Sequence, residues 1–184
     1  MVNNFTYNDT IINALEKSIS LDRLSAYLQK TLGDKEKAFE LYAWNTEISA
    51  ELYAPLQGLE IALRNALHKE LSGVYGATWY DNSQIPFNYI TNQKINNAKR
   101  MLKNTVDPSR MVAELSFGFW VTLLSKGDQG AYHNELWTPA LHKSFPNVKK
   151  KRTEVHKELG YLRKLRNRIA HHEPIFKRHL TADY

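Results

Sequence analysis

The chain has 184 residues, a formal net charge of +6 and no cysteine, a composition that excludes disulfides and thiolate metal sites. A chain of this length buries about two-thirds of its unfolded surface, so its core needs no metal or disulfide for support. No apolar run approaches the roughly 20 residues that span a bilayer, and the N-terminus lacks the basic-then-apolar order of a secretory signal. We therefore expect a cytoplasmic protein with one domain over residues 1–184, or a tight pair of subdomains, without a membrane partner or cofactor.

Helix signals dominate the first half of the chain. Ser20 and Asp34 predict the N-caps of two helices, because their side-chain oxygens accept the unpaired amide protons of a first turn. Pro55 predicts the first turn of a third helix, since proline has no amide proton to leave unpaired there, and Gly73 predicts its end. These signals place core helices over about residues 34–72.

The second half begins with an irregular connector over about residues 73–92, where turn formers and aromatic residues mix. Asp107 followed by Pro108 predicts the start of a nearly all-apolar helix over residues 108–124, which we expect in the middle of the core. No strand pattern of comparable strength occurs in the sequence. The prediction is therefore an all-α fold, a bundle of five to seven helices.

A last long helix is expected over residues 148–172, with Asn147 as its N-cap and an apolar stripe of normal width. Pro174 cannot continue this helix, because its ring collides with the carbonyl group four residues earlier. We therefore expect His171 and His172 in the last helical turn.

Positive charge is concentrated at this end of the chain. Eleven Lys and Arg against four Asp and Glu lie from Asn147 onward, a net charge of +7, so residues 1–146 carry 14 basic and 15 acidic groups. A near-neutral body with one strongly basic segment is typical of a polyanion binder, although a solvated helix face has the same composition. The basic residues that we expect to contact an RNA backbone are Lys149, Lys150, Lys151, Arg152, Arg163, Lys164, Arg168, Lys177 and Arg178.

The run "LRNRIAHHEPIF", residues 165–176, carries the groups best suited to chemistry. Arg166 projects near the edge of the apolar stripe, where a guanidinium pairs with a carboxylate or binds an anion. Asn167 lies four residues before His171, so its amide can orient the imidazole. His171 would move a proton at the 2′-hydroxyl or the departing 5′-oxygen of RNA, while Arg166 meets the charge on the phosphoryl group. Because one imidazole serves one proton at a time, a second copy across a two-fold axis would complete the site.

Other interpretations stay open on the residues alone. The two histidines also fit a purely structural role, whereas a metal site is disfavoured because adjacent histidines diverge by about 100° on a helix. No phosphate-binding loop, dinucleotide fingerprint or Gly-x-Ser-x-Gly elbow is present. Glu60, Arg64, Asn65 and His68 lie on one predicted helix. Glu60, Arg64 and His68, at four-residue steps, either form an intrahelical ladder of ion pairs, or the row lies beside the run, with Glu60 as the carboxylate partner of Arg166.

The segment "RNRIAH", Arg166 to His171, resembles the Arg-x4-6-His motif of the HEPN superfamily of helical nucleases. The longer run resembles the abortive-infection, Abi-like branch of that superfamily (AbiD/AbiF type). Residues 40–68, 113–124 and 136–146 agree with the same branch in the same order. The resemblance therefore extends over most of the chain.

This resemblance implies a HEPN fold and a metal-independent endoribonuclease that leaves a 2′,3′-cyclic phosphate. Arg166 and His171 would be the catalytic pair of a site shared across a homodimer; His172 also satisfies the looser motif spacing. Relatives act in phage defence or as the toxin of a toxin–antitoxin pair, some inhibited by a small structured RNA. The alternative is a HEPN module that binds a partner RNA and does not cleave it. A further short helix after Tyr184 is also implied.

Overall fold

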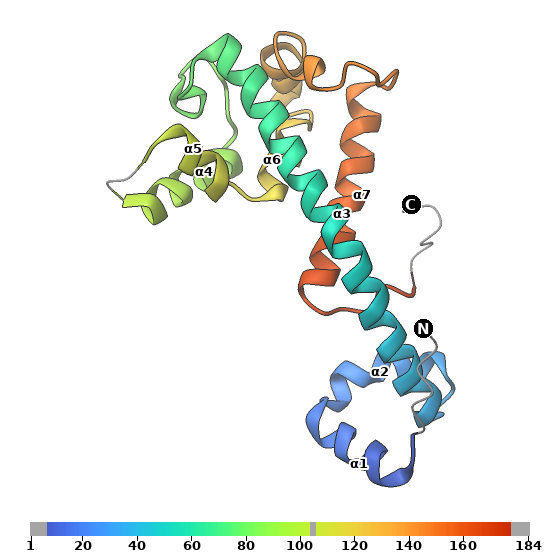
Figure 1. The fold of residues 1–184 in the computed structure, drawn as a ribbon. Coiled ribbons are helices and arrows are strands. Elements are labelled where there is room, and N and C mark those ends of the chain that lie inside the picture. Colours follow the sequence, from blue (N-terminus) through green and yellow to red (C-terminus); the bar gives the residue numbers. More distant parts are fainter. Residues whose placement is uncertain (1–6, 104–105, 178–184) are drawn as a thin grey trace. The chain divides into compact units, whose positions relative to one another are not determined.

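The computed structural model describes residues 7–103 and 106–177, and within these ranges it contains seven α-helices and no strand (Figure 1). The predicted all-α fold is confirmed. The helices are α1 (Asp9–Ser18), α2 (Leu21–Lys30), α3 (Lys35–Tyr75), α4 (Tyr89–Leu102), α5 (Pro108–Glu114), α6 (Phe117–Leu123) and α7 (Arg152–Ala170). Short 3-10 or π-helical turns are η1 (Trp79–Asp81), η3 (Asp128–Gly130), η4 (His133–Trp137) and η5 (Leu141–Ser144).

Tertiary contacts group the chain into two compact units. The first unit joins the residues up to Ala54 with those from Leu165 onward, and the second unit comprises Pro55–Lys164. Both α3 and α7 have residues in each unit. The expectation of a single domain or two subdomains stays a prediction.

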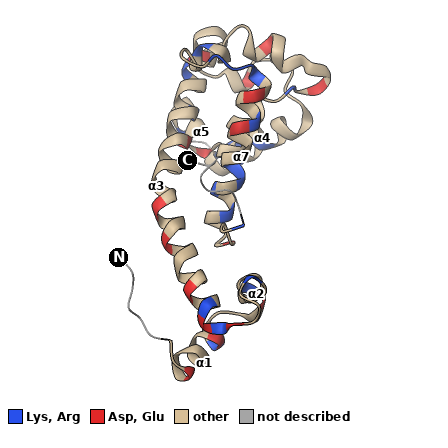
Figure 2. Cartoon of the chain, turned by 90° about the vertical axis from the view of Figure 1, so that its right-hand side faces the viewer, with Lys and Arg blue, Asp and Glu red and all other residues tan. Residues whose placement is uncertain are grey.

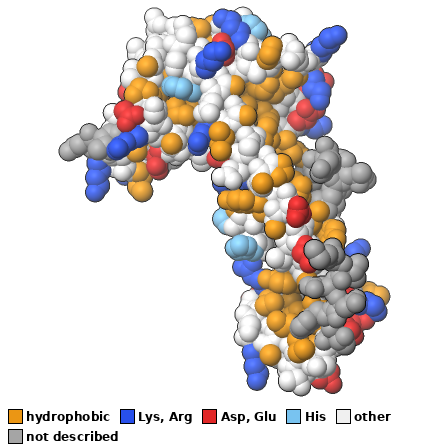
Figure 3. Space-filling model, viewed as in Figure 1, with side chains coloured by type: hydrophobic (Ala, Val, Ile, Leu, Met, Phe, Trp, Pro, Cys, Tyr) orange, Lys and Arg blue, Asp and Glu red, His pale blue; other side chains and the backbone are white. Residues whose placement is uncertain are grey.

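The first unit packs around the side chain of Tyr27 on α2, which is 1% exposed. Its ring meets those of Tyr42 and Phe176 with centroid distances of 5.2 and 5.1 Å. The Tyr27 hydroxyl is buried and has no hydrogen-bond partner among the described residues. Burial, followed by the neighbouring Tyr42, raises the pKa of Tyr27 to about 12. Hydrophobic side chains also gather on the molecular surface over α1 and α2, and none of the residues of α1 is buried (Figure 3).

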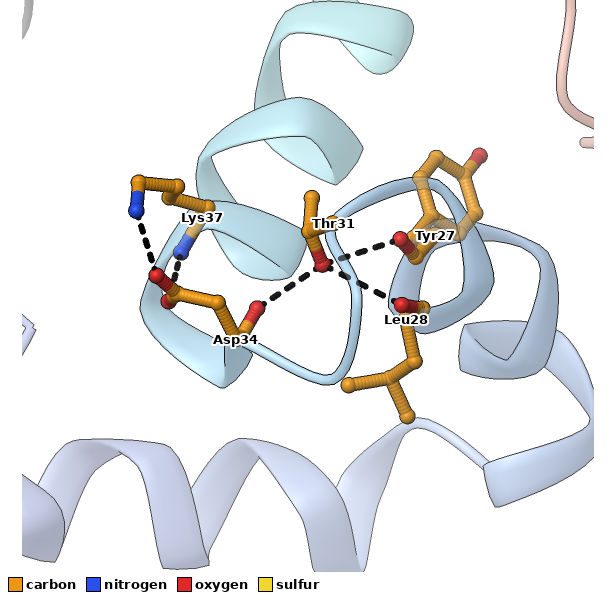
Figure 4. Close-up of polar contacts among 5 residues, drawn as sticks. All are labelled: Tyr27, Leu28, Thr31, Asp34 and Lys37. Carbon is orange, nitrogen blue, oxygen red and sulfur yellow. Dashed lines mark hydrogen bonds and ion pairs between the residues drawn. The ribbon is translucent and has the colours of Figure 1, made fainter.

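The turn between α2 and α3 is built on Thr31 and Asp34 (Figure 4). The Thr31 hydroxyl lies 3.1, 3.4 and 2.9 Å from the carbonyl oxygens of Tyr27, Leu28 and Asp34, so its one proton serves one of three acceptors at a time. The Asp34 carboxylate accepts the backbone amide of Lys37 at 3.1 Å and contacts its ammonium at 2.6 Å. Asp34 is therefore the N-cap of α3, as the sequence predicts.

Helix α3 runs for 41 residues through Pro55, so the prediction that a separate helix begins at Pro55 is wrong. Proline lacks the amide that would bond the carbonyl of Glu51, yet the helix continues on both sides of it. The helix also passes Gly73, the predicted end, and stops at Tyr75 before Gly76, which has a φ of +86°.

The second unit has an aromatic centre at Trp79, in the predicted irregular connector. Trp79 is fully buried and stacks on Phe119 with a centroid distance of 6.2 Å, while Trp120 lies tilted at 5.7 Å. The Trp79 indole nitrogen donates to Nδ1 of His68 at 3.0 Å, and burial lowers the pKa of His68, so this imidazole is a neutral acceptor. Helices α4 and α5 lie side by side in this unit (Figure 1).

Two further helix boundaries differ from the prediction. The apolar helix expected over residues 108–124 is broken at Leu115, whose carbonyl accepts the Trp120 indole proton at 3.1 Å, and Ser116 caps a new helix, α6. Helix α7 begins at Arg152 rather than after Asn147, and Val148, placed on its apolar stripe, is 44% exposed. Burying an indole N–H requires an acceptor, and the broken helix supplies one.

We predict that Pro55→Ala raises the free energy of unfolding by about 1–3 kcal/mol. The substitution restores an interior helix bond and removes a ring clash, which together are worth about 3 kcal/mol. Part of this gain is lost because alanine, unlike proline, leaves the unfolded chain more conformational freedom. Urea unfolding followed by far-UV circular dichroism measures the change. Gln57→Ala, exposed on the same helix, is the control and should shift stability by under about 0.5 kcal/mol. An unchanged midpoint for Pro55→Ala would contradict a continuous α3.

Candidate functional site

Helix α7 ends in a left-handed turn at His172, which has a φ of +55°. The His172 amide donates to the carbonyl of Ile169 at 3.0 Å, and the Glu173 amide donates to that of Arg168 at 2.8 Å. These two bonds form a Schellman motif, a common way to satisfy the last carbonyl groups of a helix. Glycine usually occupies the left-handed position, so His172 holds a conformation that costs about 1 kcal/mol or more.

His171 lies at the C-cap of α7, one residue before this turn. Its backbone amide still donates to the Asn167 carbonyl at 2.9 Å, so helical hydrogen bonding extends to His171. The prediction that both histidines lie in the last helical turn is therefore wrong for His172. The exposed His171 imidazole makes no hydrogen bond or ion pair within the described part of the chain, and the predicted contact with the Asn167 side-chain amide is absent there.

Arg166 is half-buried on α7, directly after the buried Leu165. In a regular helix Arg166 and His171 are about 140° apart around the axis and about 7.5 Å apart along it. A phosphate that binds both must therefore lie toward the end of the helix, where the long arginine side chain can extend to it.

Two distant residues hold the turn after α7. The Arg23 guanidinium donates to the His172 carbonyl at 3.1 Å. The amide of Ile175, a residue with no exposed surface, donates to Oδ1 of the buried Asn45 at 2.7 Å. Sequence reasoning missed both contacts, because no local pattern marks a residue whose partner lies more than a hundred positions away.

A surface groove of about 460 Å³ borders the same turn. The lining residues are Tyr42, Thr46, Ser49, Ala50, Tyr53, Ile169, Ala170 and His172. His172 thus lines the groove, while His171 does not. The Thr46 and Ser49 hydroxyls donate to the carbonyl groups of Tyr42 and Asn45 at 3.0 and 2.6 Å, so their protons are already used within α3.

The other predicted site residues divide between the two units. Glu60, Arg64 and Asn65 lie on α3 in the second unit, and the Nε atom of Arg64 is buried without a partner. Their predicted place beside Arg166 stays a prediction, because Arg166 belongs to the first unit.

Several of the predicted RNA-contacting cations already have partners, although Lys and Arg recur along α7 (Figure 2). Arg168 donates to the Pro174 carbonyl at 3.1 Å and lies 3.8 Å from the Glu173 carboxylate. Arg152 donates to the Leu124 carbonyl at 2.7 Å, and burial lowers its pKa. Lys150 pairs with Glu158 at 2.7 Å, and Arg163 is half-buried. Lys149, Lys151, Lys164 and Lys177 are exposed, and Arg178 lies outside the described residues.

Residues 7–103 and 106–177 contain no group of three His, Cys, Asp or Glu side chains placed to hold a metal ion. Within the same ranges, none of the helices is both long enough and apolar enough to cross a membrane.

We predict opposite effects of glycine at the two histidines. His172→Gly should leave the free energy of unfolding unchanged or raise it by up to about 1 kcal/mol, since glycine relieves the positive φ. His171→Gly should lower it by about 0.5–1 kcal/mol, because φ at His171 is not positive and glycine only adds freedom to the unfolded chain. Urea unfolding measures both variants, and a loss of stability in His172→Gly would refute the strained turn.

Comparison with known proteins supplies the family. The family described as Abi-like protein matches residues 12–177, a range that includes α2 to α7 and the turn at His172. The chain has no significant match among curated proteins or solved structures. Because the matched range covers most of its 184 residues, the chain belongs to the Abi-like protein family.

Proposed function

We propose that this Abi-like protein is a metal-independent endoribonuclease of the HEPN type that acts in abortive infection or as the toxin of a toxin–antitoxin pair. One observation carries the proposal: the Arg-x4-His run ends in an exposed imidazole without a partner among the described residues, on a turn held by Arg23 and Asn45. Membership of an abortive-infection family supports the role in phage defence. RNA is the substrate, and a small antitoxin RNA is a candidate inhibitor.

In the proposed reaction His171 removes the proton of a 2′-hydroxyl, whose oxygen then attacks the adjacent phosphorus atom. The bond from phosphorus to the 5′-oxygen breaks, and that oxygen takes up a proton as it leaves. The products are a 2′,3′-cyclic phosphate and a 5′-hydroxyl. Arg166 stabilises the negative charge that builds on the phosphoryl oxygens. The anchored turn contributes by holding the backbone that carries the imidazole in one place before the substrate arrives.

Two protons move in this reaction, one from the nucleophile and one to the leaving group. One imidazole handles one of them at a time, so His171 of a second copy supplies the other in a two-fold symmetric dimer. His172 is a structural residue of the turn in this scheme, because its backbone conformation and its carbonyl bond are its contributions.

We predict cleavage of single-stranded RNA in EDTA by the native chain. Arg166→Ala and His171→Ala should each lower the rate by about 10²–10⁴-fold, the usual contribution of an oxyanion partner or a proton-transfer group. His172→Gly should cleave at the native rate. Labelled RNA resolved on a gel, with end-group analysis for the cyclic phosphate, measures all four proteins. Activity lost on chelation would reveal a metal enzyme, and binding without cleavage by every version would select the RNA-binding module.

We also predict a homodimer, so multi-angle light scattering should give about twice the 21.3 kDa mass of the chain. His171→Ala and the native chain should give the same mass, because the imidazole acts in the reaction and not in assembly. A mass of one chain for an actively cleaving protein would remove the shared site and require a second proton-transfer group within the same chain.

A further inference from the structure

A row of cationic side chains lies along one face of α7 in the second unit. Arg152, His156 and Arg163 are separated by four and seven residues, which places them within about 40° around the helix axis. All three are half-buried. They belong to the second unit, whereas the candidate catalytic turn belongs to the first.

Arg163 of this row lies against the neighbouring helix α6, and Lys94 on α4 adds a fourth cation. A Cβ atom at Gly118 on α6 would lie 3.5 Å from Cδ of Arg163 and 3.8 Å from its Nη1, so the arginine side chain lies across α6. Helix α4 packs against α6 and carries the half-buried Lys94. Burial and then Arg163 lower the pKa of Lys94, and burial followed by Arg152 and Arg163 lowers the pKa of His156. The four side chains are therefore electrostatic neighbours.

The cluster has no acidic partner in the part of the chain that the structure describes. Lys94, His156 and Arg163 make no hydrogen bond or ion pair there. Arg152 donates one bond to the Leu124 carbonyl, and its buried Nε has no partner. Lys99 lies on the same helix as Lys94 but differs from it in having an acidic partner, Asp81.

Half-buried cations that influence one another electrostatically raise the free energy of the folded chain, and anions bound along the row offset this cost. Arginine presents a fork of N–H donors that matches the oxygens of a phosphate group, and lysine adds a compact charge. A phosphodiester supplies one negative charge and two unbridged oxygens to such a cluster.

We propose that Lys94, Arg152, His156 and Arg163 form a row of phosphate contacts on the second unit that binds the backbone of a single-stranded RNA. This inference rests on the proposed function only in taking RNA as the ligand. The site binds backbone rather than bases, so it adds affinity without sequence preference.

The test measures binding of a labelled single-stranded RNA whose 2′-hydroxyls are methylated, so that it cannot be cleaved. Fluorescence anisotropy across a salt series gives the dissociation constant and its salt dependence. Lys94→Gln and Arg163→Gln should each weaken binding by about 3–10-fold and reduce the slope of log K against log salt by about 0.7, the value for one lost phosphate contact on a single strand.

Three matched variants separate a direct contact from a general loss of charge or fold. Lys99→Gln, on the same helix but paired with Asp81, should keep the native slope. Lys94→Arg keeps the positive charge and should also keep the slope of log K against log salt. This variant shows whether Lys94→Gln weakens binding by removing the charge or by disturbing the fold. Gln57→Ala, at an exposed uncharged residue of α3, should also bind with the native slope.

Native slopes in both Lys94→Gln and Arg163→Gln, or no RNA binding by the native chain, would overturn the site. The native chain could instead bind a mononucleotide with micromolar affinity, and Arg163→Gln could abolish that binding while the RNA slopes stay unchanged. This result would assign the cluster to a small phosphate ligand and overturn the RNA site. Loss of cleavage with the predicted slopes intact would refute only the nuclease, since the methylated RNA reports binding alone.

Discussion

The hydrogen bond from the Ile175 amide to Oδ1 of Asn45 closes the first unit. Ile175 has no exposed surface, so water cannot replace the acceptor if the bond is lost, and an unsatisfied buried amide costs about 1–3 kcal/mol. The bond joins α3 to the segment after α7. Together with the bond from Arg23 to the His172 carbonyl, it fixes the turn that presents His171 to solvent.

Local chemistry made much of the fold predictable. Ser20, Asp34 and Asp107 each accept an amide of the following first turn, as their positions before helical runs indicate. The same local reasoning gave the wrong prediction that a helix begins at Pro55. A proline that suits a first turn is also tolerated inside a long helix, where many intact hydrogen bonds and buried contacts offset one missing bond. The helix propensity of one residue does not include the stabilisation that the rest of the helix provides.

The features that could not be predicted from the sequence depend on specific side-chain contacts. At Leu115, where the helix breaks, the carbonyl accepts the buried Trp120 indole proton, and hydropathy alone indicates a continuous helix there. At the candidate site, the sequence placed Arg166 and His171 near a helix end, and the structure has that end at Ala170. The left-handed conformation of His172 and the anchoring role of Asn45 depend on contacts between distant segments. Lys94 was missed because its cationic neighbours lie on another helix.

The two bonds that hold the turn span 149 and 130 positions of the chain, so each joins one segment to another that is synthesised much later. The second unit is continuous in sequence, so a nascent chain can complete it before residues from Leu165 onward exist. The turn beside His171 gains its anchors only once His172 and Ile175 have left the ribosome. A chain that folds in this order completes the turn beside the proposed catalytic histidine after its second unit.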